Sequence, residues 1–290
     1  MSRRPSLTER LDLLVDALEA GREALPAQVV AEGDDLVVRA RERLGLAGEA
    51  TVVALAGATG SGKSSLFNAL CGQQLAATGA TRPTTGEAAA ALWAAEPAAV
   101  HGLLDWLEVG VRHALPVRES DPTDLVLLDL PDHDSVTLAH RAVAERLYQR
   151  VDQLVWVVDP QKYADGVLHE RYLRPLAALA PVMVLVLNQA DRLAAADRAA
   201  CVADLARLAA ADGLGDVPVL AVSAQTGDGV DALRELLRLA ASRRRAATDR
   251  LTAEVVAVAG GVLVACGAPV RTADRGEPGL VRALERAAGV

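Results

Sequence analysis

Three glycines, a lysine and a serine stand close together at a spacing suited to phosphate binding. Residues 57–64 read Gly-Ala-Thr-Gly-Ser-Gly-Lys-Ser, which fits the pattern G-x-x-x-x-G-K-[ST]. Glycines let backbone N–H groups converge on phosphate oxygens at the start of a helix, where the helix dipole favours anions. Lys63 adds a positive charge for the β- and γ-phosphates, and the Ser64 hydroxyl suits Mg²⁺. The pattern predicts a nucleoside-phosphate site rather than a flexible glycine turn. The residues expected at the phosphates are Gly57, Thr59, Gly60, Ser61, Gly62, Lys63, Ser64 and Ser65.

A second polar segment predicts the choice of base. Residues 188–191, Asn-Gln-Ala-Asp, follow the apolar segment 182–187. They resemble the Asn-Lys-x-Asp guanine motif of the GTPase superfamily, with Gln189 in the lysine position. The carboxylate of Asp191 can accept hydrogen bonds from guanine N1–H and from its exocyclic amine, whereas adenine offers the wrong pattern. The resemblance also implies that Asn188 ties this segment to the phosphate loop, and it favours GTP and GDP over ATP.

Three further residues complete the expected base contacts. Ser223-Ala224-Gln225 follows the last predicted strand and resembles the Ser-Ala-Lys loop of the same superfamily, in which a backbone N–H meets guanine O6. The residues that the resemblance assigns to the base and its loops are Asn188, Gln189, Asp191, Ser223, Ala224 and Gln225.

The segment after a predicted strand at 125–129 resembles a switch region of the superfamily. Residues 129–132, Asp-Leu-Pro-Asp, resemble Asp-x-x-Gly, whose aspartate, here Asp129, holds Mg²⁺ through water. Asp132 replaces the glycine whose N–H reaches the γ-phosphate, so a carboxylate adds repulsion there. His133 falls where relatives keep the residue that orients the attacking water. A solvent-facing loop histidine is the open alternative, because positioning a water needs geometry that sequence does not contain.

Another segment contains three threonines that compete for one role. Residues 81–85, Thr-Arg-Pro-Thr-Thr, lie where the family places its Mg²⁺-binding switch threonine. Thr84 or Thr85 is preferred, and Thr81 is the third choice. The resemblance thus assigns Ser64, Thr84, Thr85 and Asp129 to the metal, and Lys63, Thr84, Thr85 and His133 to catalysis.

The resemblance extends from about residue 51 to residue 222 and has the character of the Era-like and dynamin-like GTPases, including actinobacterial proteins of the YfjP-like type. It implies a protein that binds Mg²⁺ and GTP and hydrolyses GTP to GDP and phosphate as a slow molecular switch. Two alternatives stay open. One is a dynamin-like mechanochemical GTPase that dimerises with nucleotide at a membrane. The other is a nucleotide-binding assembly module with negligible hydrolysis.

After residue 50, apolar runs of strand length alternate with helical patterns, which is typical of a mostly parallel sheet covered on both faces. We therefore predict an α/β fold with a doubly wound sheet, flanked by N- and C-terminal helices; the resemblance implies the Ras-like P-loop GTPase version of it. The expected strands are 51–56, 88–93, 125–129, 153–158, 182–187 and 217–222. The expected helices of this region are 63–71, 101–108, 136–150, 168–178, 197–210 and 230–245.

Helical patterns on both sides of this region divide the chain into three expected parts. Residues 1–47 are predicted to be an N-terminal helical segment broken by Pro26, and residues 48–245 to be the GTPase domain. Residues 246–290 are predicted to be a C-terminal helical segment. Because the sequence stops within a helical pattern, this last segment is expected to be truncated.

Composition narrows the classes of protein and partner. With 51% hydrophobic and 23% charged residues, the 290-residue chain does not have the composition of a disordered one. A net charge of −8 argues against broad binding to nucleic acid. Three scattered cysteines form neither a zinc motif nor a disulfide framework, which favours the cytoplasm. The expected partners are a guanine nucleotide and either a second copy of the chain or a protein effector.

One apolar stretch leaves membrane contact open. Residues 255–270 are 16 uncharged residues between Glu254 and Arg271. A membrane-spanning helix needs about 20 residues, and this run contains three glycines and a proline. A buried helix is the preferred interpretation. Membrane contact through this stretch, or through a part of the protein beyond residue 290, is the alternative.

Overall fold

The computed structural model describes residues 5–44, 50–76, 88–93, 100–106, 109–116, 124–130 and 151–266. These residues belong to two compact units. The sheet unit falls within residues 50–242, and the helical unit combines residues from 1–49 with residues from 243–290.

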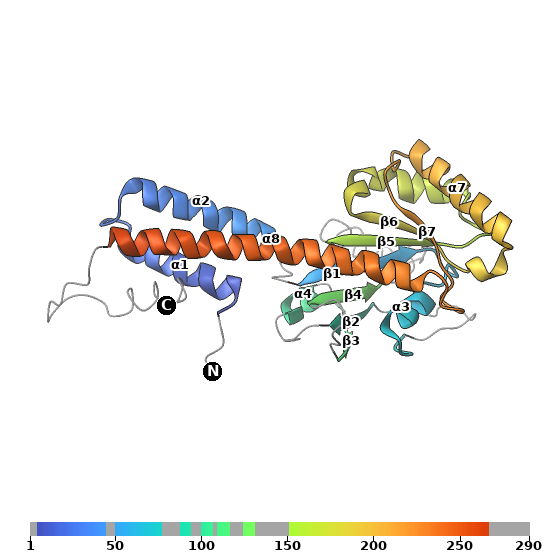
Figure 1. The fold of residues 1–290 in the computed structure, drawn as a ribbon, viewed down its shortest axis with the longest axis horizontal. Coiled ribbons are helices and arrows are strands. Elements are labelled where there is room, and N and C mark those ends of the chain that lie inside the picture. Colours follow the sequence, from blue (N-terminus) through green and yellow to red (C-terminus); the bar gives the residue numbers. More distant parts are fainter. Residues whose placement is uncertain are drawn as a thin grey trace. The chain divides into compact units, whose positions relative to one another are not determined.

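Seven strands form the sheet in the described part of the sheet unit, in the order β3-β2-β4-β1-β5-β6-β7 (Figure 1). β2 pairs antiparallel with β4, and the other neighbouring pairs are parallel. The predicted α/β fold with a mostly parallel, doubly wound sheet is therefore confirmed. The strands are β1 Thr51–Gly57, β2 Ala89–Trp93, β3 Val111–Ala114, β4 Leu125–Asp129, β5 Gln153–Val158, β6 Met183–Leu187 and β7 Val219–Ala221.

The central strands are buried along their whole length because helical segments cover both faces of the sheet. Every residue of β1, β4, β5 and β6 is buried, which explains their nearly continuous apolar sequence. On one face, Phe67 of α3 (Lys63–Cys71) and Leu233 of α8 (Val230–Ala265) pack with the sheet. On the other face, the Trp156 ring of β5 lies 6.2 Å from the Tyr172 ring, measured between centroids. This packing fixes the strand ends that carry the predicted site residues.

The segment predicted as one helix over residues 168–178 is instead three short helical pieces. α6 covers Gly166–Leu168, the π-helical turn η2 covers His169–Leu173, and the 3₁₀-helix η3 covers Arg174–Val182. Proline occupies the first turn of η3 and recurs at Pro181, and proline lacks the N–H that a regular α-helix uses. The apolar periodicity is therefore right about a helical segment and wrong about its type.

Other element boundaries also differ from the prediction. α8 continues past the expected end at Arg245, because no glycine or proline interrupts residues 246–259. β3 is not predicted by the sequence, since its four residues include Arg112 and His113 and show no apolar alternation. α4 (His101–Trp106) and α7 (Ala195–Ala211) lie where helices are expected. The helix predicted over residues 136–150 lies outside the described residues.

The helical unit is built from α1, α2 and the later part of α8. α1 covers Leu7–Gly21 and α2 covers Ala27–Leu44, on either side of Pro26. Leucines of α1 and α2 form one buried cluster with apolar side chains of α8. The three-part division of the chain at residues 47 and 245 stays a prediction.

The apolar stretch over residues 255–270 contributes to this cluster as far as the end of α8. Val255, Ala259 and Val262 are fully buried with the side chains of α1 and α2, in keeping with a buried helix. Residues 267–270 lie outside the described part of the chain. Among the helices that the structure describes, none combines the length and the apolar character needed to cross a bilayer.

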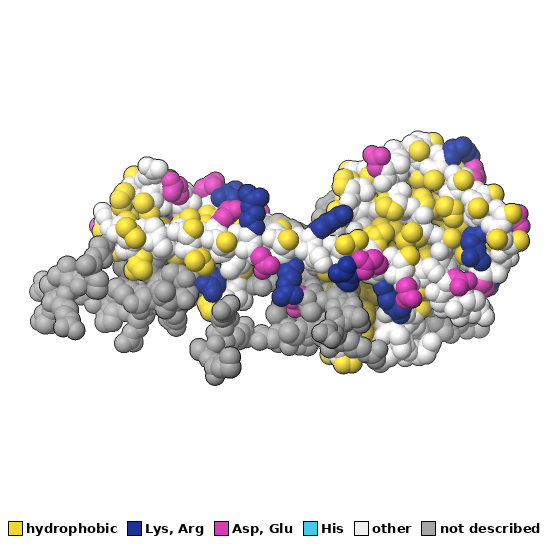
Figure 2. Space-filling view, in the orientation of Figure 1, with side chains coloured by type: hydrophobic (Ala, Val, Ile, Leu, Met, Phe, Trp, Pro, Cys, Tyr) yellow, Lys and Arg dark blue, Asp and Glu magenta, His cyan; other side chains and the backbone are white. Residues whose placement is uncertain are grey.

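Charged side chains of both signs are interspersed over the face shown in Figure 2. Several form ion pairs one helical turn apart, such as Arg234 with Asp231 and Arg238 with Glu235. Exposed pairs of this kind contribute little to stability because water screens the two charges. They therefore shape the surface charge more than they stabilise the fold.

Candidate nucleotide-binding site

The glycine-rich loop joins the end of β1 to the start of α3. Gly57 is the last residue of β1, and Lys63 is the first residue of α3. Gly60 and Gly62 have φ of +83° and +86°, a left-handed conformation that glycine adopts readily. The loop thus places a helix N-terminus at the carboxyl edge of the sheet, the usual location of anion sites in α/β folds.

Side-chain donors reach each carbonyl oxygen of the phosphate loop from residue 57 to residue 62. Lys63 Nζ lies 2.8 Å from Gly57 O and 3.2 Å from Ala58 O, and Lys162 Nζ lies 3.2 Å from Thr59 O. Gln189 Nε2 lies 2.8 Å from Gly60 O. Asn188 Nδ2 lies 2.9 Å from Ser61 O and 3.3 Å from Gly62 O. These donors offset the negative ends of the carbonyl dipoles. The loop is therefore suited to an anion, which successive backbone N–H groups at a helix start can cradle.

Lys63 is buried within this arrangement. Only 4% of its surface is exposed, and its ammonium group donates to two loop carbonyls. Burying an ammonium without partners would be costly, so these contacts let the charge stay inside the protein. The positive charge is consequently held at the loop in advance of any phosphate.

Asn188 joins the phosphate loop to both segments that are predicted to bind the base. It is 1% exposed, and its Oδ1 accepts a hydrogen bond from the backbone N–H of Ala224 at 3.1 Å. A buried amide that loses its partners costs about 1–3 kcal/mol. Asn188 therefore holds the phosphate loop, its own segment and the segment around Ala224 in fixed positions relative to one another. The resemblance expects it to make such a link to the phosphate loop.

Ser223 orients the carboxylate of Asp191. Ser223 Oγ donates to Asp191 Oδ1 at 2.6 Å and accepts from the backbone N–H of Thr226 at 3.1 Å. Ser223 is fully buried, whereas Asp191 is exposed. The carboxylate is thus fixed through one oxygen at the rim of the site, as an acceptor that recognises a base should be.

A cavity of about 130 Å³ lies between the phosphate loop and the base-binding segments. Its lining residues are Gly62, Ser65, Asn188, Gln189, Asp191, Arg192, Ala224 and Gln225. Sequence reasoning misses only Arg192 among them, because a single arginine beside a motif forms no pattern of its own. The structure therefore brings two of the predicted phosphate residues, Gly62 and Ser65, and all the predicted base residues except Ser223 to one cavity.

Ser64 and Asp129 offer the oxygen donors that Mg²⁺ prefers. Ser64 lies in the first turn of α3, and the fully buried Asp129 ends β4 beside Leu55 of β1. Burial, and then the negative charge of Asp129, raise the pKa of the Cys71 thiol to about 12. A hydroxyl and a buried carboxylate beside the phosphate loop fit a hard divalent cation.

The remaining predicted residues cannot be placed beside these. The threonines Thr81, Thr84 and Thr85 and the pair Asp132 and His133 lie outside the described residues. Their assignments to the metal and to the attacking water stay predictions.

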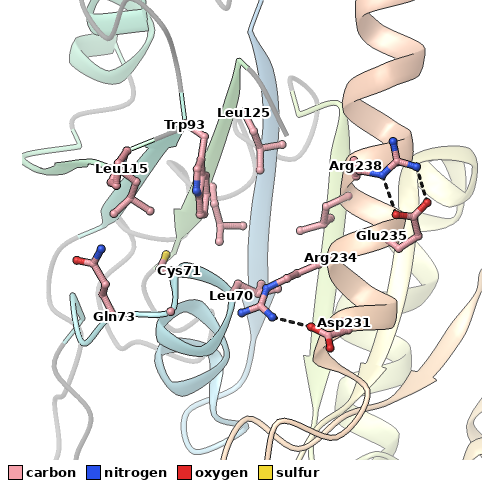
Figure 3. A pocket seen from close by; sticks show the side chains of 14 residues that line it. Leu70, Cys71, Gln73, Trp93, Leu115, Leu125, Asp231, Arg234, Glu235 and Arg238 are labelled. Carbon is pink, nitrogen blue, oxygen red and sulfur yellow. Dashed lines mark hydrogen bonds and ion pairs between the residues drawn. The ribbon is translucent and has the colours of Figure 1, made fainter. Parts of the chain in front are cut away.

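A larger cavity of about 400 Å³ lies away from the phosphate loop (Figure 3). Leu125, the first residue of β4, lines it, whereas the phosphate loop follows the last residue of the parallel strand β1. The two cavities therefore lie at opposite ends of the strands, the larger one at the amino ends and the smaller one at the carboxyl ends. Figure 3 shows Trp93 and Leu115 on one side of the larger cavity and Arg234, paired with Asp231, on the other.

Replacing Gly62 by alanine is expected to destabilise the sheet unit more than replacing Gly60. Both glycines have left-handed φ, where a Cβ costs about 1–2 kcal/mol. A Cβ on Gly62 would lie 2.4 Å from Asn188 Nδ2, whereas one on Gly60 would meet no atom within 4 Å. Urea unfolding of Gly62→Ala and of Gly60→Ala measures the difference. Equal free energies of unfolding would contradict the close approach of Gly62 to Asn188.

Solved structures with a similar fold include two of a bacterial dynamin pair described as sensing and tethering membranes. They superpose with TM-scores of 0.54 and 0.52 at 13% and 12% identity, over 89% of this chain and 47% and 46% of theirs. The chain thus spans less than half the length of these dynamin chains. Era from Aquifex aeolicus superposes with a TM-score of 0.48 at 15% identity, over 79% of this chain and 69% of Era. No curated protein matches the sequence.

The sequence model of one protein family matches the part of the chain that holds the phosphate loop. The family is described as "50S ribosome-binding GTPase", and the match covers residues 52–189. This range contains all of β1 but its first residue, together with the phosphate loop, Asp129 and Asn188. The match, the fold and the loop agree, and the chain carries a P-loop GTPase domain.

Proposed function

We propose that the chain binds GTP and GDP together with Mg²⁺ and hydrolyses GTP to GDP and phosphate as a slow molecular switch. The observation that carries the proposal is the meeting of the phosphate loop with Asn188, Asp191 and Ala224 at one cavity. A phosphate loop alone does not select a base. A fixed carboxylate at the other end of the same cavity supplies that selection.

The chain's own residues divide the work of binding. Asp191 accepts from guanine N1–H and from the exocyclic amine, and Ser223 holds it for that purpose. The phosphate loop receives the phosphates, and Lys63 neutralises part of their charge. Ser64, Asp129 and either Thr84 or Thr85 would hold Mg²⁺, which when bound neutralises charge on the β- and γ-phosphates.

Hydrolysis requires a water to attack the γ-phosphorus while the bond to the β–γ bridging oxygen breaks. GDP leaves with the electron pair of that bond, and the proton of the water passes to the phosphate. His133 would orient the water, and Asp132 would weaken the hold on the γ-phosphate because its carboxylate adds negative charge where the family has a glycine. We therefore expect a rate constant of GTP hydrolysis of roughly 10⁻⁴ to 10⁻² s⁻¹, the range of unassisted GTPases of this architecture.

Single-turnover hydrolysis with purified protein tests the proposal. His133→Ala should lower the rate about tenfold or more, which is about 1.4 kcal/mol of barrier, and leave the affinity for GTP nearly unchanged. Asp132→Gly is the matched variant and should raise binding of GTP relative to GDP. A His133→Ala rate equal to wild type would make the histidine a bystander. No turnover in the wild-type protein would favour the assembly module with negligible hydrolysis.

The second candidate function is that of a dynamin-like mechanochemical GTPase. It is favoured by the fold likeness to the bacterial dynamin pair, which extends over 89% of this chain and therefore beyond the GTPase domain. In this case the protein would dimerise with nucleotide and associate with a membrane. Hydrolysis assays with and without liposomes, combined with sedimentation in GTP and in GDP, separate it from the switch. Liposome-stimulated turnover with GTP-dependent dimers would support the dynamin-like function.

A further inference from the structure

Both lysines of this chain donate to the phosphate loop. Lys63 and Lys162 are its two lysines, and the other basic residues among its 30 Lys and Arg are arginines. Lys63 belongs to the loop itself and bonds Gly57 O and Ala58 O. Lys162 comes from a loop after β5, and its Nζ lies 3.2 Å from Thr59 O. A lysine ammonium is a compact charge on a flexible stem, so it can reach a backbone carbonyl of a neighbouring loop.

The loop that presents Lys162, residues 159–165, is stiffened by its own hydrogen bonds and is called the bracket loop. Asp159, which is 4% exposed, accepts at its backbone oxygen from the N–H groups of Lys162 and Tyr163, at 3.2 and 3.0 Å. Its Oδ1 accepts from the N–H of Gln161 at 2.9 Å, and the N–H of Asp165 donates to Lys162 O at 3.0 Å. The Lys162 backbone is therefore held from both sides.

Two side-chain contacts attach the bracket loop to helical segments behind it. His169 of η2 is 7% exposed, and its Nε2 lies 2.8 Å from Tyr163 O. The Tyr163 hydroxyl donates to Asp204 Oδ2 of α7 at 3.2 Å. The position of Lys162 thus depends on where η2 and α7 hold Tyr163.

The imidazole ring of His169 has an oxygen partner at each of its two nitrogens. A carbonyl oxygen can only accept, so Nε2 carries a proton. Nδ1 contacts Asp212 Oδ2, and the other oxygen of this buried carboxylate accepts from Arg174 at 3.1 Å. His169 is therefore held between Asp212 and Tyr163 O, and its Nε2–H donates to the bracket loop.

We propose that His169 is a positioning residue for the nucleotide site: it holds the Tyr163 carbonyl, which fixes the bracket loop, so that Lys162 clamps Thr59 O and keeps the phosphate loop in its binding shape. Thr59 directly precedes Gly60, whose left-handed φ turns the loop toward α3. A clamp at this carbonyl opposes a change of that turn in the absence of nucleotide. The proposal rests on the proposed nucleotide binding for its effect on affinity, but the clamp itself exists without a ligand.

Hydrogen exchange of the nucleotide-free protein tests the clamp directly. Lys162→Met keeps the length of the side chain and removes its donors, and Lys162→Arg restores a donor. In Lys162→Met, and in His169→Phe, which keeps a ring without donors, amides of residues 58–62 should exchange about fivefold faster or more. Lys162→Arg should return exchange toward the wild-type rate. Wild-type exchange in Lys162→Met would overturn the proposal, and because Lys162 lies at the surface this variant should keep its fold.

A double-mutant cycle then asks whether His169 acts through Lys162. Lys162→Met should raise the Kd for GDP about three- to tenfold, as expected for the loss of one partly exposed charged hydrogen bond. His169→Phe should also raise the Kd for GDP. The Kd of the double variant should be no higher than that of the single variant that binds GDP more weakly. Additive effects would show that His169 acts by another route and would overturn its assignment. If wild-type protein fails to bind GDP, the proposed function fails, while the exchange experiment still decides on the clamp.

Discussion

Replacing Lys63 by alanine is expected to weaken the binding of GTP and of GDP by similar factors. The ammonium group is buried, and it is held by the carbonyls of Gly57 and Ala58 at the place where the phosphates enter. Removing it takes away one charge-assisted contact to the phosphates, at a cost of about 1.5–3 kcal/mol, or roughly 10- to 150-fold in Kd. The affinity for GDP should fall as well, because the β-phosphate is common to both nucleotides.

Ser64→Ala is the matched control, because it removes a neighbouring group with a different role. Its hydroxyl is assigned to Mg²⁺ rather than to phosphate, so excess Mg²⁺ should partly restore the affinity of Ser64→Ala. Excess Mg²⁺ should leave the affinity of Lys63→Ala low. Titration calorimetry at two Mg²⁺ concentrations makes the comparison. Wild-type affinity for GDP in Lys63→Ala would contradict the role of the loop in phosphate binding.

Asp191→Asn is expected to exchange guanine for xanthine as the preferred base. Ser223 Oγ donates to Asp191 Oδ1, and an amide oxygen at that position can accept the same hydrogen bond. The amide nitrogen then faces the base, where it is mispaired with the exocyclic amine of guanine and paired with the C2 carbonyl of xanthine. Each mispaired polar group costs about 1–3 kcal/mol. GDP should therefore bind about tenfold more weakly or worse, and xanthosine diphosphate correspondingly better.

Asp191→Ala separates this exchange from simple damage to the site. Alanine removes the acceptor without adding a donor, so both guanine and xanthine nucleotides should bind weakly. Competition against a fluorescent GDP analogue measures the wild-type protein and both variants on one scale. If Asp191→Asn weakens the binding of GDP and does not improve the binding of xanthosine diphosphate, Asp191 does not contact the edge of the base.

The architecture could be predicted because its elements are coded locally. β1 and α3 lie within one residue of their predicted bounds, since a continuous apolar run and a glycine-to-helix transition leave little choice. The same is true of β4 and β5. The types of η2 and η3 could not be predicted, because prolines and side-chain contacts, rather than apolar period, decide between helix types.

The candidate site could be proposed from sequence where its residues are neighbours in the chain, as in the phosphate loop and in residues 188–191. Lys162 was not, because its approach to Thr59 depends on β5 lying beside β1 in the sheet, which no local pattern contains. The same holds for His169 and Asp212, which are 43 positions apart. Long-range pairs of this kind become visible only when the strands and helices are placed.

The affinity of the wild-type protein for GDP and for ADP, measured by titration calorimetry with Mg²⁺, tests the central claim most directly. Low-micromolar or weaker binding of GDP is expected. ADP should bind at least about 30-fold more weakly, because adenine mispairs two polar groups at Asp191 at about 1–3 kcal/mol each. The same preference should hold for GTP over ATP. Equal affinities for GDP and ADP would contradict the assignment of Asp191 to the base and, with it, the proposed guanine-nucleotide site.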